Sequence, residues 1–392
     1  MDKQVKILHP IFVDPDGKNL KIQEIFTNIP KVEITDVRAD ETNYMAIFIR
    51  QPYRVAEYFE QISPEAWVLM QKGLVKPLIM TTYEQWDLFE IFKEFNDSPY
   101  KYFIKNFLDR DIPEENITWV VPDHNHKEQI KYLKSKGHDV KCRFLQYNSL
   151  VELMSKYANK YNIKNHKISK HFSCLCKGRP RHNRIGMIYN LWYNNLLTKG
   201  NISCESYTNT VQTKGYHWID DKMSTDQFMS KFDGWDETQE QFKQDLPMSF
   251  DDQQNKHWWP DVYDESALFE SAFVWIACET AKEQDGIFIT EKTLKAVAYG
   301  KPFLINGDSG SIEYLKSIGY KTFADFWDES YDLDNSVQKI EKITKIIKNI
   351  CTMSLTDINS MYNDMLPILK HNQNLLRNTN QYDTLLGELQ NG

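Results

Sequence analysis

The chain has 392 residues, of which 41% are hydrophobic, and a net charge of −8. This length exceeds what one hydrophobic core usually serves, so it favours two domains, and the hydrophobic content excludes a largely disordered chain. The acidic balance argues against a protein that coats nucleic acid by bulk electrostatics. No apolar run approaches the length that crosses a bilayer, and the N-terminus lacks an apolar signal segment. We therefore expect a cytoplasmic protein with no membrane partner.

The first part of the chain predicts strands that alternate with helices. Expected strands lie at 5–8, 78–80, 117–121 and 140–145, and expected helices at 83–95 and 127–136. This alternation is typical of a parallel sheet with helices on both faces. We expect an N-terminal α/β domain over residues 1–165.

The second part repeats this pattern and ends in helices. Expected strands lie at 171–175, 272–277 and 303–305, expected helices at 184–197 and 291–299, and a helical pattern runs from 337 to 386. These elements predict a second α/β domain over residues 166–335 and C-terminal helices over 336–392. The expected fold class is therefore α/β, with two facing Rossmann-like domains and a helical C-terminal tail.

The cysteines and acidic triplets give little indication of a metal. Six cysteines are spread along the chain, which is typical of reduced thiols. Cys174 and Cys176 form a C-x-C pair in a predicted strand, and such a pair without a matching Cys or His pair is usually structural. Three D-x-D triplets, at 14–16, 109–111 and 332–334, are close to the number that chance gives among 55 acidic residues. We predict no metal site.

The most informative segment starts the helix predicted at 291–299. Thr290 can cap this helix, and the free N–H groups and positive dipole end of a helix start favour an anion. Lys292 in the first turn opposes the dipole preference, so it needs a negative ligand such as phosphate, while Glu291 can accept hydrogen bonds from ribose or sugar hydroxyls. The alternative is an ordinary solvent-exposed Glu-Lys pair.

A glycine-rich turn at 307–310 follows the predicted strand at 303–305. This is the position at which open α/β sheets bind ligands, and glycine lets the backbone approach a ligand closely. The alternative is that the glycines serve only the backbone geometry of a strand-to-helix junction and bind no ligand. The spacing of a phosphate-binding P-loop is absent.

Several motifs taken together resemble a known family. The segments ACET at 277–280, FITEK at 288–292 and GKPFL at 300–304 resemble the donor-binding core of α-1,3-fucosyltransferases. The similarity to glycosyltransferase-like proteins of bacteriophages is closer, because it adds GYKTF at 319–323 and ESYD at 329–332. The resemblance covers residues 170–335 and implies two domains of the GT-B type. If the protein is viral, its expected location is the cytoplasm of the host cell.

The resemblance implies a role for each matching residue. Phe288 would stack on the nucleotide base, Glu291 would bind donor hydroxyls, and Lys292 would hold the diphosphate. Glu279, which matches the first residue of the family's E-N pair, is expected among the donor-binding residues with Thr290. Arg184 is the best match to an arginine that clamps the phosphates. Two positions depart from the family pattern, because Phe288 replaces a tyrosine and Thr280 an asparagine.

A basic run at 166–184 contains six Lys and Arg residues and no acidic residue. Beside the predicted donor site, cations such as Lys177, Arg181 and Arg184 would stabilise the charge that builds up on a departing nucleoside diphosphate. Such a site can work without a metal. The same run could instead contact DNA phosphates.

An inverting transfer needs a general base, which we expect at a strand end of the N-terminal domain. Glu84 follows the predicted strand at 78–80, at a place where some fucosyltransferases keep a catalytic glutamate. The alternative is a glutamate favoured by the dipole of a helix start. Asp123 and His124, after the strand at 117–121, are the second choice.

These features predict a glycosyltransferase that moves a sugar from a nucleoside-diphosphate sugar to a hydroxyl acceptor, with no other cofactor required. Donor binding is expected in residues 166–335 and acceptor binding in residues 1–165. The acceptor is a glycan or a hydroxylated base in duplex DNA. The alternative is a non-catalytic module that binds nucleotides or DNA.

Overall fold

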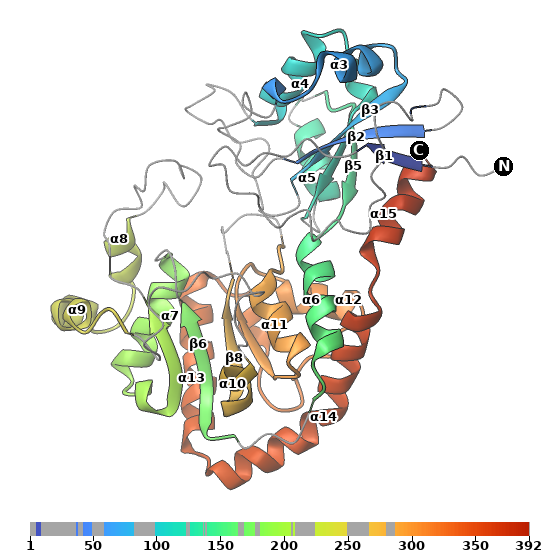
Figure 1. Cartoon of the computed structure of the whole chain (residues 1–392). Helices are drawn as coiled ribbons and strands as arrows, with labels where there is room; N and C mark the ends of the chain where they lie inside the picture. Colours follow the sequence, from blue (N-terminus) through green and yellow to red (C-terminus); the bar gives the residue numbers. More distant parts are fainter. Residues whose placement is uncertain are drawn as a thin grey trace. The chain divides into compact units, whose positions relative to one another are not determined.

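The structure is a computed structural model in which the chain divides into two compact units. Unit 1 comprises Met1–Leu153 with Asn380–Gly392, and unit 2 comprises Met154–Thr379 (Figure 1). The structure describes residues 5–8, 37, 42–48, 59–81, 99–122, 126–135, 137, 139–163, 168–176, 181–204, 207, 224–248, 266–279 and 287–391.

Unit 1 is built on a five-stranded parallel sheet whose strand order follows the sequence. Its strands are β1 (Val5–Leu8), β2 (Thr42–Phe48), β3 (Val75–Met80), β4 (Thr118–Val121) and β5 (Arg143–Gln146). Its helices are α3 (Pro64–Gln71), α4 (Pro99–Leu108), the short η3 (Glu114–Asn116), α5 (His126–Ser135), the first part of α6 (Ser149–Lys160) and α15 (Gln381–Gln390).

Both faces of this sheet are covered by apolar side chains, as a parallel sheet requires. Trp119 of β4 packs on one face against Phe103 of α4 and Phe144 of β5. Its neighbour Val120 points to the other face, in a cluster with Leu389 of α15. Because successive strand residues alternate between the faces, β4 joins the two clusters.

Unit 2 is built on a four-stranded parallel sheet with the order β7-β6-β8-β9. Its strands are β6 (Lys170–Cys176), β7 (Gly200–Cys204), β8 (Ala272–Cys278) and β9 (Phe303–Asn306). The other elements are α7 (His182–Tyr193), η4 (Leu197–Lys199), α8 (Thr225–Met229), α9 (Trp235–Gln244), α10 (Ser266–Ser271), α11 (Glu291–Ala298), α12 (Ser311–Ser317), η6 (Ser330–Leu333), α13 (Ser336–Thr352) and α14 (Leu355–Asn378).

The strand order of unit 2 creates a switch point between β6 and β8. From β6 the chain moves outward to β7, and it then returns to the other side of β6 to form β8 and β9. At such a switch point the connections on the two sides leave the sheet in opposite directions. In open α/β sheets, ligands usually bind there, beyond the carboxyl ends of the two central strands.

The C-terminal helices are shared between the units. Helix α13 packs against α7, and α14 packs against α11, so both belong to unit 2 (Figure 1). Helix α15 contacts β1 and β5 of unit 1. The prediction of two parallel-sheet α/β domains with a helical C-terminal region is confirmed.

All seven predicted strands are present, and some elements were missed. Strands β2 and β7 and helices α3, α4 and α6 were not predicted, while the helix expected at 83–95 lies outside the described residues. Gly300 ends α11 with a φ of 61°, and a Cβ there would lie 2.3 Å from the Ile163 side chain, so only glycine is accommodated.

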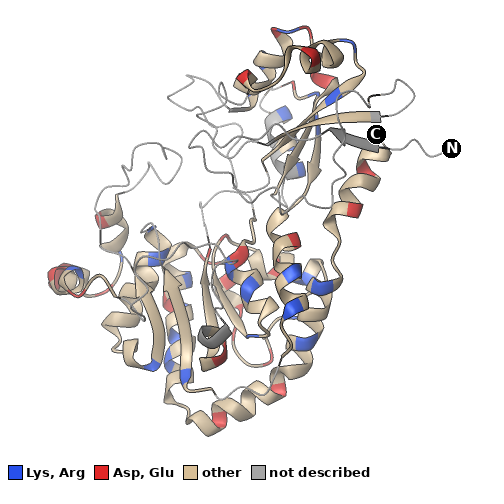
Figure 2. Cartoon of the chain, viewed as in Figure 1, with Lys and Arg blue, Asp and Glu red and all other residues tan. Residues whose placement is uncertain are grey.

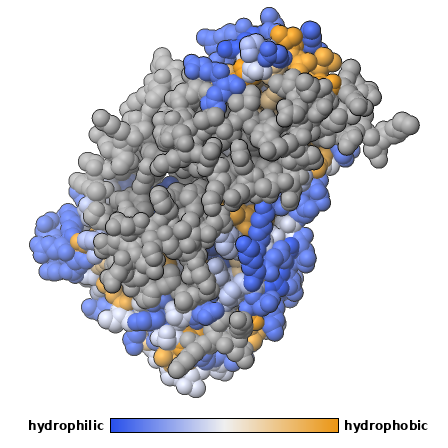
Figure 3. All heavy atoms as spheres, in the orientation of Figure 1, coloured by the Kyte–Doolittle hydropathy of each residue, from blue (hydrophilic) through white to orange (hydrophobic). Residues whose placement is uncertain are grey.

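The described surface is mainly hydrophilic in the view of Figure 3. Hydrophobic residues come to the surface over α3 and α4, where Val68 and Leu108 are 43% and 49% exposed. Scattered apolar residues are normal on a protein surface. Among the described residues, no helix has both the length and the apolar character to span a membrane.

Candidate functional site

The candidate site lies where β8 and β9 end, next to the switch point of the unit 2 sheet. Cys278 is the last residue of β8 and pairs in register with Asn306, the last residue of β9. Glu279 and Gly307 follow these two residues. Parallel strands bring their carboxyl ends to one edge of the sheet, so both segments start at the same edge.

Glu279 is buried beneath the first turn of α11. It is 1% exposed, and its Oε1 accepts hydrogen bonds from Thr290 N at 3.1 Å, Thr293 N at 3.2 Å and Thr293 Oγ1 at 2.7 Å. Its Oε2 accepts a short hydrogen bond from Thr290 Oγ1. A carboxylate at a helix N-terminus is stabilised by the free N–H groups and by the helix dipole, so Glu279 fixes the start of α11 on the end of β8.

Lys292 lies on the outer side of this turn. Its Nζ donates to Thr290 Oγ1 at 2.9 Å and to Glu291 Oε1 at 2.8 Å, and it lies 3.9 Å from Glu279 Oε2. The side chains of Lys292 and Glu291 are 23% and 24% exposed. Figure 2 shows acidic and basic residues next to each other on α11. The helix start therefore presents a partly accessible ammonium group beside a partly accessible carboxylate.

Glu291 is ionised over a wide pH range. Burial by itself would raise the pKa of its carboxyl group, but the Lys292 ammonium, and after it Lys295, outweighs burial and lowers this pKa to about 2. At neutral pH the Glu291 side chain is therefore a carboxylate, which accepts hydrogen bonds.

The lowered pKa predicts how Glu291 affects stability as the pH changes. A carboxyl group whose pKa falls on folding stabilises the folded state above its unfolded pKa, and this contribution is lost as the pH falls through the folded pKa. The difference in unfolding free energy between wild type and Glu291→Gln should be constant above the ordinary pKa of 4.5 and shrink between 4.5 and about 2. Urea unfolding of both proteins over this pH range, followed by the protection of the α11 amides from hydrogen exchange so that unit 2 is observed by itself, measures it. A difference that already varies well above 4.5 would contradict the assignment.

The first turn of α7 is tied to the same strand ends. Asn183 Nδ2 donates to the backbone oxygens of Glu279 at 2.9 Å and of Asn306 at 3.2 Å, and Asn306 Nδ2 donates to Asn183 O at 2.8 Å. Both asparagines are buried. This amide pair brings the starts of α7 and α11 to one edge of the sheet. This pair was not predicted from the sequence, in which a polar residue next to each apolar pattern is the only sign of it.

The predicted arginines lie at the start of α7. Arg181 is the residue before the helix and is partly exposed, whereas Arg184 is 8% exposed. The pKa of the Cys176 thiol is lowered to about 5, first by a hydrogen bond from the Cys174 thiol and also by the positive charge of Arg184. Arg184 lies in the first turn of α7, the helix that follows β6 in the chain.

The other predicted site residues are either buried or lie outside the residues that the structure describes. Phe288 is 3% exposed, so its ring packs inside unit 2, and its role in base stacking stays a prediction. Glu84, Lys177, Asp123 and His124 lie outside the described residues. The structure thus brings Glu279, Thr290, Glu291 and Lys292 into direct contact, with Arg184 and Arg181 on the neighbouring helix start.

The GYKTF and ESYD motifs and the glycine-rich turn have structural partners. Glu329 accepts hydrogen bonds from Phe323 N and from Thr322 Oγ1, both at 2.7 Å, which joins GYKTF to ESYD. Lys339 of α13 is buried and donates to Gly307 O at 2.8 Å. Ser309 Oγ donates to the backbone oxygen of Asp332 at 3.1 Å. The contacts of Lys339 and Asp332 fix the turn at 307–310, and both residues lie outside the candidate site.

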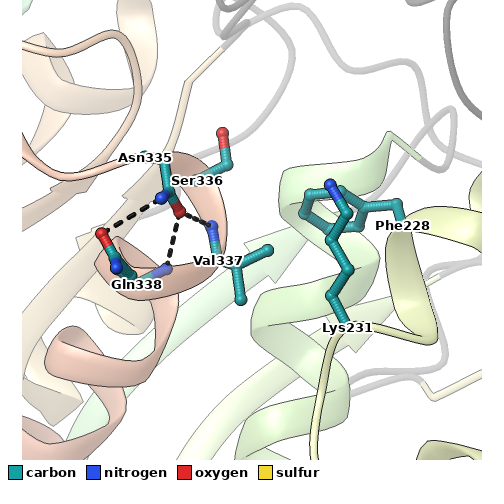
Figure 4. A pocket seen from close by; sticks show the side chains of 6 residues that line it. All are labelled: Phe228, Lys231, Asn335, Ser336, Val337 and Gln338. Carbon is teal, nitrogen blue, oxygen red and sulfur yellow. Dashed lines mark hydrogen bonds between the residues drawn. The ribbon is translucent and has the colours of Figure 1, made fainter.

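A hollow of about 370 Å³ lies between the α8 region and the start of α13 (Figure 4). Lys231 extends over the Phe228 ring, with its Nζ 5.9 Å from the ring centre, and Phe228 stacks on His182 at the start of α7. Asn335 caps α13 by accepting from Val337 N and Gln338 N, both at 3.1 Å. None of the predicted site residues that the structure describes lines this hollow.

Comparison with known proteins gives matches only among solved structures. A scan against protein-family models and a search of curated proteins give no match. The chain is similar to an alpha,alpha-trehalose-phosphate synthase (UDP-forming) from Burkholderia vietnamiensis, with 10% identity and a TM-score of 0.44 over 96% of this chain and 84% of that one. A mutant of T4 phage BGT in complex with UDP-glucose matches with 10% identity and a TM-score of 0.41 over 100% of this chain and 96% of the other.

A third match is the GtfA/B complex, with 8% identity and a TM-score of 0.40 over 91% of this chain. The chain spans 59% of the length of that protein. Identities and TM-scores at this level assign no activity to the chain.

Proposed function

We propose that the chain transfers a sugar from a nucleoside-diphosphate sugar to a hydroxyl acceptor, and that unit 2 binds the donor. The observation that carries this proposal is the pair formed by Glu291 and Lys292 at the start of α11, beside the switch point of the sheet. A partly accessible cation at a helix N-terminus suits a phosphate group, and the adjacent carboxylate suits sugar hydroxyls. The resemblance around residues 277–304 implies the same donor chemistry.

In this proposal Lys292 exchanges partners when the donor binds. Its ammonium group donates to Thr290 and Glu291 in the structure. Glu291 is 24% exposed and can turn outward, so a phosphate oxygen can take its place on Lys292. The released carboxylate then accepts hydrogen bonds from the hydroxyl groups of the sugar.

Glu279 acts as a positioning residue rather than as a donor contact. Its burial and its four hydrogen bonds leave no carboxylate oxygen facing solvent. It orients Thr290 and, through it, Lys292. A group held in place before the donor binds needs no reorganisation when charge develops on the leaving diphosphate.

The remaining roles extend the proposal to the predicted residues. Arg184, assisted by Arg181 and Lys177, stabilises the diphosphate, and Phe288 contacts the base after a local rearrangement. Glu84 is the general base of an inverting reaction that needs no metal. The acceptor is a hydroxyl of a glycan or of a modified base in duplex DNA.

Thermal stabilisation by nucleotides tests the donor proposal. A ligand that binds the native state at 100 times its Kd stabilises it by about 2.7 kcal/mol, so one nucleoside diphosphate among UDP, GDP, ADP and TDP should raise the melting temperature. The corresponding nucleoside, which lacks the phosphates, is the matched control and should give little shift. We expect the shift to persist in EDTA. No stabilisation by any of the four would contradict the proposal.

Release of the nucleoside diphosphate separates an enzyme from the alternative, a non-catalytic binding module. With the donor that stabilises the protein best, transfer or slow hydrolysis should release the diphosphate catalytically. Binding without any release over many hours would favour the binding module.

A further inference from the structure

Three cysteine thiols of unit 2 converge in the core below the candidate site. Cys174 and Cys176 come from β6 and Cys278 from β8, and all three are at most 4% exposed. Cys174 Sγ lies 3.9 Å from both Cys176 Sγ and Cys278 Sγ, and all three sulfur atoms lie within 4.8 Å of one another. They are the only such group of three among the described His, Cys, Asp and Glu residues.

The sheet geometry explains why these thiols meet. Residues two apart on a strand point to the same face, so Cys174 and Cys176 share a face of β6. The register Phe172↔Val274, continued along both parallel strands, places Cys278 beside Cys176. On the other side, Cys204 of β7 is the register partner of Cys176.

The sulfur spacing fits a thiolate-bound metal ion. Zinc binds sulfur at about 2.3 Å, which places two sulfurs of a tetrahedral site roughly 3.8 Å apart. Two of the sulfur pairs have nearly this spacing already. Soft thiolate ligands select zinc or other thiophilic metals over magnesium and calcium.

Neighbouring groups suit such an ion as well. Asn306 Nδ2 donates to Cys278 Sγ at 3.7 Å, and N–H donors of this kind orient metal-bound thiolates. Arg184 is buried in the first turn of α7, the helix that follows β6. One divalent ion with three thiolates carries one net negative charge, which this guanidinium offsets.

We propose that Cys174, Cys176 and Cys278 bind a Zn²⁺ ion in the core of unit 2, with Cys204 as the nearest register neighbour for a fourth ligand. The ion would link β6 to β8 directly before Glu279. It would thereby fix the strand end on which α11 is placed, independently of whether a sugar donor binds.

Metal analysis of the purified full chain tests the proposal. Protein produced with added zinc and kept in a reductant that does not chelate metals should contain about one zinc per chain by mass spectrometry. Loading with Co²⁺ instead should give the sulfur-to-cobalt charge-transfer absorption of a thiolate site. Cys278→Ser should lose both signals. Cys351→Ser, which removes a buried thiol of α13 outside the cluster, should keep them.

Thiol labelling of the wild-type protein tests the site without any substitution. Zn²⁺ should slow alkylation of Cys174, Cys176 and Cys278 at least tenfold in a peptide-resolved mass-spectrometric assay, and the rate at Cys351 should not change. The proposal would be overturned if protein exposed to zinc retained none and showed no selective protection of the three thiols. Because neither measurement uses a sugar donor, this outcome is distinct from a failure of the proposed transferase activity.

Discussion

Replacing Lys292 with alanine is expected to lower sugar transfer or donor hydrolysis by about 10²- to 10³-fold, the usual effect of removing one fixed charge partner of a developing anion. The proposal gives the ammonium group to the diphosphate, whose negative charge increases as the sugar bond breaks. Steady-state release of the nucleoside diphosphate from the preferred donor measures this effect. The variant should remain folded, because Glu279 keeps its four hydrogen bonds from threonine groups.

Lys295→Ala is the matched control for this prediction. It removes the same charge from α11, one turn further along the helix, and leaves the group proposed to bind the phosphate in place. Its activity should stay within a few-fold of wild type. If Lys292→Ala were as active as wild type, Lys292 would not be the residue that binds the phosphate. If both lysine variants lost the same activity, the effect would come from the overall charge of α11 and not from a phosphate contact of Lys292.

Replacing Glu279 with glutamine is expected to destabilise the start of α11 by about 2 kcal/mol. The change keeps the size of the side chain but removes its charge, and it places an amide NH2 opposite groups that are themselves donors. Hydrogen bonds to a charged group contribute about 1.5–3 kcal/mol each, and part of this is recovered when the Thr290 hydroxyl turns around. Since each 1.4 kcal/mol is tenfold, the amides of Glu291–Ala298 should exchange with solvent roughly 30-fold faster.

Hydrogen exchange resolved by mass spectrometry suits this test because a chain with two units need not unfold in one transition. Glu313→Gln is the control, because Glu313 is also a first-turn glutamate, on α12, and it is exposed. It should leave the exchange of α11 unchanged. If α11 exchanges at the wild-type rate in Glu279→Gln, the buried carboxylate does not hold this helix. Activity should fall together with the loss of protection, because Lys292 depends on the same turn.

Together the two variants separate contact from positioning. Lys292→Ala should lower turnover without changing exchange at α11, whereas Glu279→Gln should change both. A donor contact by Glu279 would instead give a loss of affinity with no loss of protection. The pair of measurements therefore distinguishes the two roles within one helix start.

Local features of the site could be predicted from the sequence. The side chain of Thr290 accepts from Lys292 N as the cap of α11, and Gly300 ends this helix in the left-handed region. Both depend on residues within a few positions of each other. Helix capping and helix termination are local interactions of this kind, so they can be recognised in the sequence.

Strand β2 shows where the sequence pattern was insufficient. Tyr44, Met45, Ala46 and Ile47 are all buried, because β2 lies inside a parallel sheet that is covered on both faces. A strand buried on both faces shows no alternation of apolar and polar residues. Without that period, a short apolar run cannot be told from a buried helix segment.

The sequence by itself determined that the chain forms two parallel α/β sheets with C-terminal helices, and that a capped helix starts with Glu291 and Lys292. Only the tertiary structure decided that Glu279 turns inward beneath that helix, and that Cys278 joins Cys174 and Cys176. Such contacts join residues on different elements, up to 104 positions apart for the thiols. Their existence depends on the order and register of the strands, which a local pattern does not contain.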